Sequence, residues 1–584
     1  MGRRPCVLLT LSAIVVAVAG AGSLEEMMAD RDYQSAKDWL IEQDRTGDTR
    51  AGALIALLHL RGQLPPDNEE VLKWLERGAG LGDHNAHSIL GLLHDTGFVV
   101  GQRDMARSLM HYYIGALGAK CPECSIVLGY RHLHGIGVPK SCDAAVRYYM
   151  SASDKVVEQL SSSELIPTFE RVRLTDENAR NRPTEESTDV IKYFEHAADG
   201  GDVSAQVALG QLSEHGIRGV PQDMGKAAMW FRRAANQGDS TAMAQLAGLT
   251  AQGLGVPQDN KTALELFQAS AKLGNAAGYA GLGHMYMEGA GVERDMRLAV
   301  KYFKEAADRG NAEAQYILGT LYYSGDAVDK SHVTALHYFT AAGHQGHTAA
   351  LYNLAQMHLL GHGTHKSCSL AVRLHKVVAE RGRWAAERHR RGHDAFCKGL
   401  MEEALWEYIS CAMYGDEVCQ LNAGWMLSQP VGYYGDDHDQ MAVQFWRLAA
   451  DQGSAIAQRV LGDYCYAEVV SGGVQEAIRR YQQAADRADA QAMFNLGYLH
   501  QWGPKQDLHL AKRYYDQAKQ ASPEAYVPTQ LALLALYVHM WWSGVSSSTV
   551  PQFRWSEYEN AVLALLCVAL ATVVYIRRDR IARI

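Results

Sequence analysis

Two cysteines three positions apart come closest to a chemical motif in this 584-residue chain. Cys121 and Cys124 have the C-x-x-C spacing of thiol–disulfide exchange sites, and His132 and His134 follow on the same segment. Redox activity needs a setting that lowers a thiol pKa, such as the βαβ context of thioredoxin-like sites, and this segment instead has the pattern of a repeat helix. The spacing of the four residues also departs from the usual zinc motifs. We therefore expect a structural or reduced cysteine pair rather than an oxidoreductase centre or a zinc site.

The rest of the chain lacks the patterns that mark enzymes. G-x-S-x-G, H-E-x-x-H and P-loop motifs are absent, and Asp and Glu are scattered without a paired arrangement. A formal net charge of −9 argues against nucleic acid as a partner, because phosphate binding needs clustered Lys and Arg. We predict a non-enzymatic protein without catalytic residues, metal site or cofactor.

A small residue recurs inside an apolar helix pattern, and its spacing indicates a helical repeat. Successive intervals are 35 to 38 residues, apart from two intervals of 81 and 69 residues that mark interrupted units. The positions are Ala56, Gly91, Gly129, Gly210, Ala247, Gly283, Gly319, Ala355, Gly424, Gly462 and Gly497. A period of this length predicts stacked helix pairs, each contacting only its neighbours.

One unit shows how the sequence forms such a pair. Gly310 is expected to end a helix in the left-handed conformation that glycine favours, and Asn311 to cap the next helix. Gly319 then lies inside that helix, where glycine costs up to about 1 kcal/mol relative to alanine. Repeating this cost at one position predicts that a neighbouring helix approaches closely there.

The repeat pattern resembles the Sel-1-like repeat family, a relative of the tetratricopeptide (TPR) repeat. The resemblance implies an all-α, right-handed superhelical solenoid of TPR-like helix pairs in three groups, to which the apolar end of the chain adds one C-terminal transmembrane helix. The predicted segments are a signal peptide at 1–21, N-terminal repeats at 22–153, a linker at 154–188, central repeats at 189–382, a second linker at 383–399, C-terminal repeats at 400–530, a near-membrane apolar helix at 531–542, a transmembrane helix at 556–576 and a cytosolic tail at 577–584.

Both ends of the chain indicate a membrane-anchored protein of the secretory pathway. Arg3 and Arg4 precede an apolar run that closes in small residues, a pattern typical of a signal peptide. Near the other end, the uncharged stretch 561–576 is extended by interfacial residues and is followed by four arginines. Because positive residues stay cytosolic, we predict a single-pass type I protein with residues 22–555 luminal or extracellular. The family resemblance described below implies that the membrane is that of the endoplasmic reticulum, which places these residues in its lumen.

Cysteine usage agrees with an oxidising compartment. Outside Cys6 and Cys567, eight cysteines permit up to four disulfides, and the sequence does not select among the 105 pairings. Asn260 begins an N-x-T sequon on the predicted luminal side. We expect Asn260 to be glycosylated.

A closer resemblance covers nearly the whole chain. Local runs at 128–131, 172–177, 352–358, 491–500 and 505–516 are similar to the sel-1 homolog family of adaptors in endoplasmic-reticulum-associated degradation, which are subunits of HRD ubiquitin ligase complexes. The resemblance implies a luminal scaffold that recruits misfolded glycoproteins and stabilises a multi-spanning RING ubiquitin ligase of the HRD type. It also implies lectin-type chaperones of the endoplasmic reticulum as partners, and it leaves homodimerisation open. The alternative is a membrane-anchored Sel-1-like scaffold with another secretory-pathway or cell-surface role.

The ligase is expected to contact the part of the solenoid nearest the membrane. The apolar segment 531–542 is too short to span a bilayer, so it either lies at the membrane or against a membrane partner, or caps the last repeat. His500, Gln501 and Trp502 come at a helix end and are expected at the surface, whereas the three apolar candidates before them also fit core positions. The candidate ligase-binding residues are Met493, Phe494, Leu499, His500, Gln501, Trp502, Trp541 and Trp542.

Overall fold

The computed structural model describes residues 21–117, 121–161, 171–176, 188–216, 220–433 and 435–542. Within these residues the regular structure is helical and no strand occurs, which confirms the all-helical repeat fold expected from the sequence. The chain divides into two compact units. The first comprises residues up to 419 together with 430–434, and the second comprises 420–429 and the residues from 435 onward.

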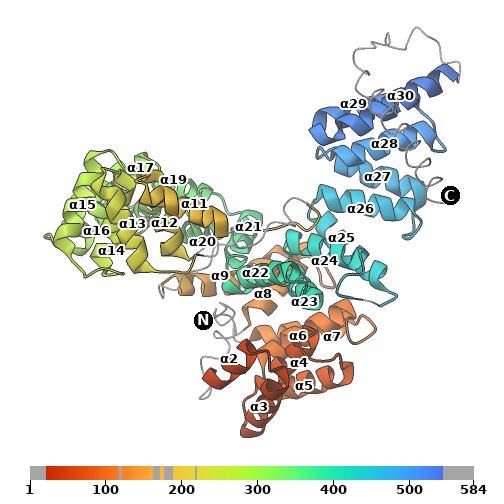
Figure 1. The fold of residues 1–584 in the computed structure, drawn as a ribbon, viewed down its shortest axis with the longest axis horizontal. Helices are drawn as coiled ribbons and strands as arrows, with labels where there is room; N and C mark the ends of the chain where they lie inside the picture. Colours follow the sequence, from red (N-terminus) through yellow and green to blue (C-terminus); the bar gives the residue numbers. More distant parts are fainter. Residues whose placement is uncertain are drawn as a thin grey trace, which may run out of the picture. The chain divides into compact units, whose positions relative to one another are not determined.

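Most helices of the first unit follow one another as pairs joined by short turns, apart from the longer interval between α9 and α11 (Figure 1). They are α2 (Ala21–Ala29), α3 (Tyr33–Thr46), α4 (Ala51–Leu60), α5 (Asn68–Gly80), α6 (His84–Thr96), α7 (Met105–Ala116), α8 (Pro122–His134), α9 (Cys142–Ser161), α11 (Thr188–Asp199), α12 (Val203–His215), α13 (Met224–Asn236), α14 (Ser240–Gln252), α15 (Asn260–Lys272), α16 (Ala276–Glu288), α17 (Met296–Asp308), α18 (Ala312–Ser324), α19 (His332–His344), α20 (Thr348–Leu360), α21 (Cys368–Ala379), α22 (Arg383–Cys397) and α23 (Met401–Ala412). The next helix, α24 (Glu417–Ser428), begins in the first unit and continues into the second.

The second unit continues the same pairing. Its further helices are α25 (His438–Asp451), α26 (Ala455–Tyr466), α27 (Gly473–Ala485), α28 (Ala490–Trp502), α29 (Leu508–Ala521), the short 3₁₀ helix η2 (Pro523–Ala525) and α30 (Tyr526–Trp542). Each packs against its neighbour along the chain from α25 to α30, so this unit is a stack of the same kind (Figure 1).

Where the small residue of a repeat is glycine, it faces an aromatic ring from the second helix of its pair. A Cβ placed on Gly319 of α18 would lie only 2.7 Å from the ring of Phe339 on α19, which is closer than side chains pack. The same relation holds in the pairs Gly91–Tyr112, Gly129–Tyr149, Gly210–Phe231, Gly283–Phe303, Gly424–Trp446, Gly462–Tyr481 and Gly497–Tyr515. The predicted close approach of a neighbouring helix is confirmed.

The turn between repeats also has the predicted glycine and cap. Gly310 follows α17 with a φ of +85°, a conformation that strains residues with a Cβ. The side chain of Asn311 accepts a hydrogen bond from the Ala314 N–H at the start of α18. The side chain of Gln315 then donates to the Ala307 carbonyl, which links α18 to the preceding helix.

Two helices far apart in the sequence pack together in the first unit. α9 lies against α20 and α21, and a disulfide joins Cys142 to Cys368 across a separation of 226 residues. The Ser153 hydroxyl and His375 Nδ1 are hydrogen-bonded at 2.8 Å. The chain therefore leaves the N-terminal repeats at α9 and returns to the same helix at α20 and α21.

The predicted linker over 383–399 is wrong. These residues form α22, which pairs with α23. A Cβ on Gly392 would meet the Tyr408 ring at 3.1 Å, so Gly392 occupies the small-residue position of the repeat. The 69-residue interval therefore contains a further repeat, which its charged sequence conceals.

Other predicted segments are described only in part. α9 extends through the first residues of the predicted linker 154–188, and α11 begins at its end. Most of the predicted signal peptide, the predicted transmembrane helix at 556–576 and the tail lie outside the described residues. Among the helices that are described, none is long and apolar enough to cross a membrane.

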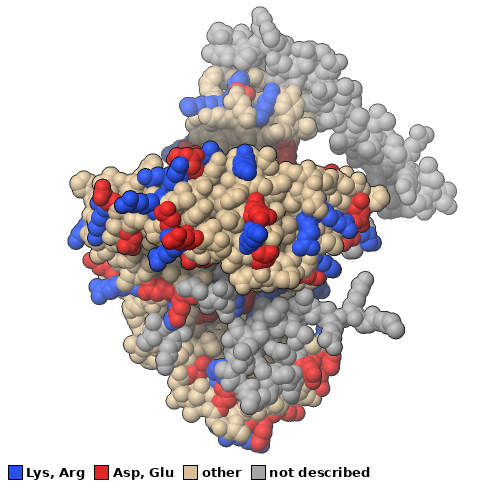
Figure 2. Space-filling model, turned by 90° about the vertical axis from the view of Figure 1, so that its left-hand side faces the viewer, with Lys and Arg blue, Asp and Glu red and all other residues tan. Residues whose placement is uncertain are grey.

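Charged side chains are mixed on the face shown in Figure 2. Among its coloured residues, Lys and Arg alternate with Asp and Glu, and no broad area has a single sign. Surface ion pairs such as Arg309–Glu305 contribute little to stability. This face therefore lacks the extended field of one sign that attracts strongly charged partners.

Candidate partner-binding and metal-binding sites

The apolar helix α30 covers the last repeat of the second unit. Leu533, Leu536 and Met540 are buried against Ala511 and Tyr515 of α29. The three side chains are three and four residues apart, so they form one face of the helix. α30 therefore caps the repeat stack, which is one of the roles left open by the sequence.

Exposed apolar side chains gather where α28 meets α30. The Trp502 side chain is 53% exposed and stacks on the His539 ring, with ring centroids 4.6 Å apart. Tyr498 lies one turn earlier on α28 and is 46% exposed, and Val538 precedes His539 on α30 and is 56% exposed. Large apolar side chains exposed together are typical of protein interaction sites. We call Tyr498, Trp502 and Val538 the α28–α30 surface.

Trp502 lies at the surface as predicted, but its neighbour does not. Gln501 is 1% exposed and accepts a 3.0 Å hydrogen bond from the Tyr515 hydroxyl, so the expected surface position of Gln501 is wrong. His500 is half-buried and stacks on Tyr514, and burial lowers the pKa of its imidazole. Helical spacing explains the difference, because successive residues point to different sides of α28.

The remaining candidate ligase-binding residues lie either in or near the core of the repeat or at the end of α30. Leu499 is buried, and Met493 and Phe494 are partly buried, which agrees with the core positions that their spacing also allowed. Trp541 and Trp542 form the end of α30, and their side chains lie outside the described residues. Tyr498 was not among the predicted contact residues, although its position four residues before Trp502 places both on one side of a helix.

The predicted glycosylation site begins a helix. Asn260 is the first residue of α15, directly after the capping residue Asp259, and its side chain is partly exposed. The Thr262 hydroxyl of the sequon donates a 2.5 Å hydrogen bond to Asp259 and is exposed. Glycosylation of Asn260 remains a prediction.

The C-x-x-C motif is a closed, buried disulfide. Cys121 and Cys124 are bonded to each other and are at most 2% exposed. His132 instead contacts the Pro139 carbonyl and the Tyr113 hydroxyl. Exchange with another protein requires an accessible sulfur, so this geometry favours a structural pair.

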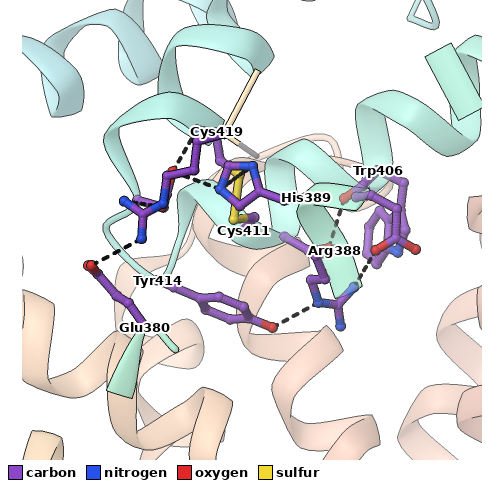
Figure 3. The surroundings of a disulfide bond; sticks show 11 residues. Glu380, Arg388, His389, Trp406, Cys411, Tyr414 and Cys419 are labelled. Carbon is purple, nitrogen blue, oxygen red and sulfur yellow. Dashed lines mark hydrogen bonds and ion pairs between the residues drawn. A yellow bond between two sulfur atoms is a disulfide. The ribbon is translucent and has the colours of Figure 1, made fainter. Parts of the chain in front are cut away.

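A buried group of charges joins the N-terminal repeats to α22 and α23. Glu407 is fully buried and pairs with Arg61 at 2.6 Å and with Arg388 at 3.0 Å. Arg388 also donates to the Tyr414 hydroxyl at 3.0 Å (Figure 3). Burial alone would raise the pKa of Glu407, but the guanidinium groups of Arg61, Arg388 and the nearby Arg391 lower it to about 2. The face of the N-terminal repeats that carries Arg61 is therefore occupied by the chain's own helices.

Four buried side chains that could hold a metal ion lie beside this charge group (Figure 3). They are His389 of α22, Cys411 at the end of α23, Asp416 before α24 and Cys419 in the first turn of α24. One ligand atom from each lies within 4.8 Å of the others. His389 Nε2 is 3.1 Å from Asp416 Oδ1 and 3.3 Å from Cys419 Sγ, and a disulfide joins Cys411 to Cys419.

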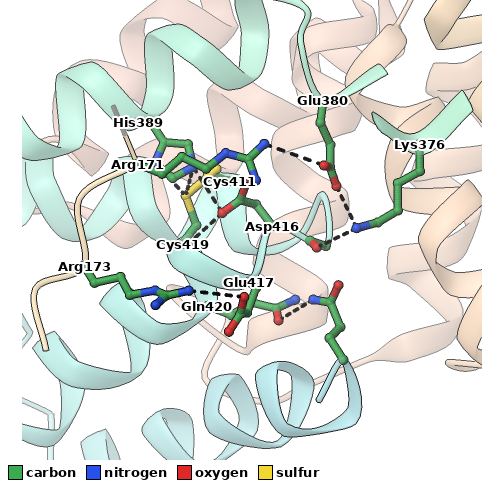
Figure 4. A network of polar contacts seen from close by, with 12 residues as sticks. Arg171, Arg173, Lys376, Glu380, His389, Cys411, Asp416, Glu417, Cys419 and Gln420 are labelled. Atoms are coloured by element: carbon green, nitrogen blue, oxygen red, sulfur yellow. Dashed lines mark hydrogen bonds and ion pairs between the residues drawn. A yellow bond between two sulfur atoms is a disulfide. The ribbon is translucent and has the colours of Figure 1, made fainter. Parts of the chain in front are cut away.

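Asp416 connects this cluster to the segment 171–176. Its carboxylate accepts a 2.9 Å hydrogen bond from the Cys419 N–H and pairs with Arg171 at 3.3 Å, while Arg171 also lies near Glu380 (Figure 4). Burial raises the pKa of Asp416, but the neighbouring His389 and Arg171 outweigh this effect and lower it. The cluster was not predicted, because His389 lies in the segment expected to be a linker. The sequence signal that could have indicated the cluster is the pair Cys411 and Cys419 with Asp416, a helix-capping residue type, between them.

Nine segments of the chain match the family described as Sel1 repeat. They are residues 50–83, 122–155, 203–239, 240–275, 276–311, 312–347, 348–382, 418–454 and 490–522. The helix pairs containing Gly91, Gly392 and Gly462 lie between these segments and have the same glycine–aromatic contact.

Three curated proteins are similar over most of their length. Protein sel-1 homolog 2 of Mus musculus is 43% identical over 573 residues, which cover 95% of this chain and 83% of the mouse protein. Its Homo sapiens counterpart is 46% identical over 491 residues, covering 82% and 71%. The ERAD-associated E3 ubiquitin-protein ligase component HRD3A of Arabidopsis thaliana is 42% identical over 542 residues, covering 87% and 79%.

Proposed function

Because the chain belongs to the Sel1 repeat family and to the group of sel-1 homologs and HRD3 components within it, we propose that it is an adaptor of a ubiquitin ligase in endoplasmic-reticulum-associated degradation. The observation that carries the proposal is the similarity to a named ligase component along 87% of the chain. The absence of enzyme motifs in the sequence supports a scaffolding role. In this role the repeats hold misfolded luminal glycoproteins and lectin-type chaperones, since helix-pair solenoids offer long binding surfaces.

The ligase contact is proposed at the α28–α30 surface together with Trp541 and Trp542. Trp502 and Tyr498 are exposed aromatic side chains of the kind that anchor protein interfaces. The predicted membrane anchor begins 14 residues after the end of α30, which keeps this surface near the bilayer in the proposed type I topology. A multi-spanning RING ligase with a small luminal surface would meet this part of the chain first.

Co-purification from detergent-solubilised membranes tests the proposal. The full chain is expected to retain a multi-spanning RING protein, and the Trp502→Ala, Trp541→Ala, Trp542→Ala triple variant is expected to lose most of it. Tyr466→Ala is the matched control, because Tyr466 is an aromatic residue of the same unit that is 47% exposed and lies on α26. If the triple variant still retains the ligase, the ligase does not bind at the α28–α30 surface and the proposed contact is wrong. Recovery of other partners without any ligase would favour a scaffold with another secretory-pathway or cell-surface role.

A further inference from the structure

The donors around the Cys411–Cys419 disulfide match the preferences of zinc. Zn²⁺ is bound by thiolate, imidazole and carboxylate groups, usually four of them in a tetrahedron. With bonds of roughly 2.0 to 2.3 Å, neighbouring ligand atoms in that tetrahedron are about 3.3 to 3.8 Å apart. His389 Nε2 lies 3.1 Å from Asp416 Oδ1 and 3.3 Å from Cys419 Sγ, so both of these separations are already close to such an edge. All four ligand atoms lie within 4.8 Å of one another.

The fourth donor needs only a local change. The Cα atoms of Cys411 and Cys419 are 5.7 Å apart on either side of the turn between α23 and α24. When the sulfur–sulfur bond is reduced, side-chain rotation alone separates the two sulfur atoms to the distance of a tetrahedral edge. The backbone that carries Asp416 stays in place, because its carboxylate caps α24 through the Cys419 N–H.

Charge favours a cation in the reduced cluster. All four side chains are buried, and buried charges are unfavourable unless they are compensated. Two thiolates and the Asp416 carboxylate would place three negative charges together. One Zn²⁺ with the Arg171 guanidinium, which pairs with Asp416 at 3.3 Å, balances them (Figure 4).

We propose that His389, Cys411, Asp416 and Cys419 form a zinc site when the two cysteines are thiols, and that the disulfide between them excludes the metal. A dithiol reductant gives two electrons to the disulfide and becomes a disulfide itself, leaving two protein thiols. Zinc binding then releases the two thiol protons to solvent and forms two zinc–sulfur bonds. Oxidation by a disulfide-bearing oxidant reverses the sequence and releases the ion. The site lies between the α22–α23 pair and the start of α24, so metal binding and the disulfide would hold the same three helices together.

The zinc content of the purified full chain tests the site. The chain is reduced with a dithiol, loaded with zinc chloride, desalted and measured by atomic emission, in parallel with an oxidised sample. One zinc ion per reduced chain and none per oxidised chain is the expected result. In Co²⁺-loaded reduced protein, thiolate-to-metal charge-transfer bands are expected, and they report sulfur ligation independently of stoichiometry.

Variants separate this cluster from other metal-binding residues. The Cys411→Ser, Cys419→Ser double variant and His389→Gln should lose the bound zinc, whereas Cys397→Ser should retain it, because Cys397 is an exposed cysteine without a disulfide. Circular dichroism checks that each variant is folded. Reduced wild-type chain without zinc, a cobalt spectrum without thiolate bands, or zinc retained by the double-serine variant would overturn the proposal. If a variant fails to fold, the zinc content of the reduced and oxidised wild-type chains still tests the proposal.

Discussion

The central repeats and the α22–α24 segment are built from the same helix pairs but are held together by different interactions. In α18 and α19 the interface is filled by the Phe339 ring against Gly319, and ion pairs such as Arg309–Glu305 lie at the exposed surface. In α22–α24 the interfaces contain buried charges and sulfur atoms, among them Glu407 and the cluster around Cys419. The two regions use different interactions because their repeats contact different numbers of neighbouring helices. A repeat stacked only on adjacent repeats needs matching shape, whereas α22 and α23 also contact the N-terminal repeats through Arg61.

The largest effect in this comparison is expected from Glu407→Ala. Removing the carboxylate leaves Arg61 and Arg388 buried without their counter-ion, and breaking a buried pair in this way costs about 3–5 kcal/mol. The free energy of unfolding of the first unit, followed by denaturant titration, should fall by that amount. Glu305→Ala is the control, since its partner Arg309 is exposed and the change should stay within about 0.5 kcal/mol. Equal effects for both variants would remove the distinction between the two regions.

The same carboxylate predicts a pH dependence. The pKa of Glu407 is about 2 in the folded chain and has its ordinary value of 4.5 when the chain unfolds. Between these values the unfolded state binds more protons, so stability rises with pH there. The contribution of Glu407 is complete above pH 4.5 and is lost as the pH falls towards 2. Wild type should therefore lose stability on acidification more steeply than Glu407→Gln, and parallel acid profiles would contradict the assignment.

A smaller loss is expected from Gly319→Leu in the central repeats. The new side chain would overlap the Phe339 ring, and such overpacking costs about 1–3 kcal/mol. Neighbouring repeats depend on this pair, so limited proteolysis should begin in the central group. Gly248→Leu is the matched control, because Gly248 lies in α14 with no atom within 4 Å of its Cβ position. A neutral Gly319→Leu variant would show that the glycine–aromatic contact does not stabilise the repeat.

The smallest change concerns one helix cap. Asn311→Ala removes the hydrogen bond to the Ala314 N–H and should cost about 1 kcal/mol, whereas Asn311→Asp keeps an acceptor and should be nearly neutral. Thermal melting of both variants checks this difference. If the alanine variant melts with the wild type, the turns contribute less to the repeat than the interhelical contacts do.

The regular part of the fold could be predicted because its determinants are local. Gly310, Asn311 and Gly319 recur at fixed spacing, and each acts within its own repeat or on the next one. The aromatic partner could have been found the same way for most of these glycines, since it follows about twenty residues later, as Phe339 follows Gly319. Helix caps and interhelical contacts therefore follow from periodicity alone.

The irregular part could not be predicted because its partners are distant. Arg388 and His389 look like a solvated charge run, and their counter-groups lie in α23 and before α24. Arg61 contacts Glu407 across more than three hundred residues. The predicted surface exposure of Gln501 was wrong for another reason. The last turn of α28 exposes only one side, which carries Trp502 and not Gln501.

A photo-crosslinking residue placed at Trp502 tests the central claim most directly. In solubilised endoplasmic reticulum membranes, the adaptor account predicts a covalent product between position 502 and a multi-spanning RING ubiquitin ligase. The same probe at Tyr193, which is exposed on α11 of the first unit, should give no such product. A ligase crosslinked from position 193 but not from 502, or no RING protein from either, would contradict the proposed contact and the function built on it.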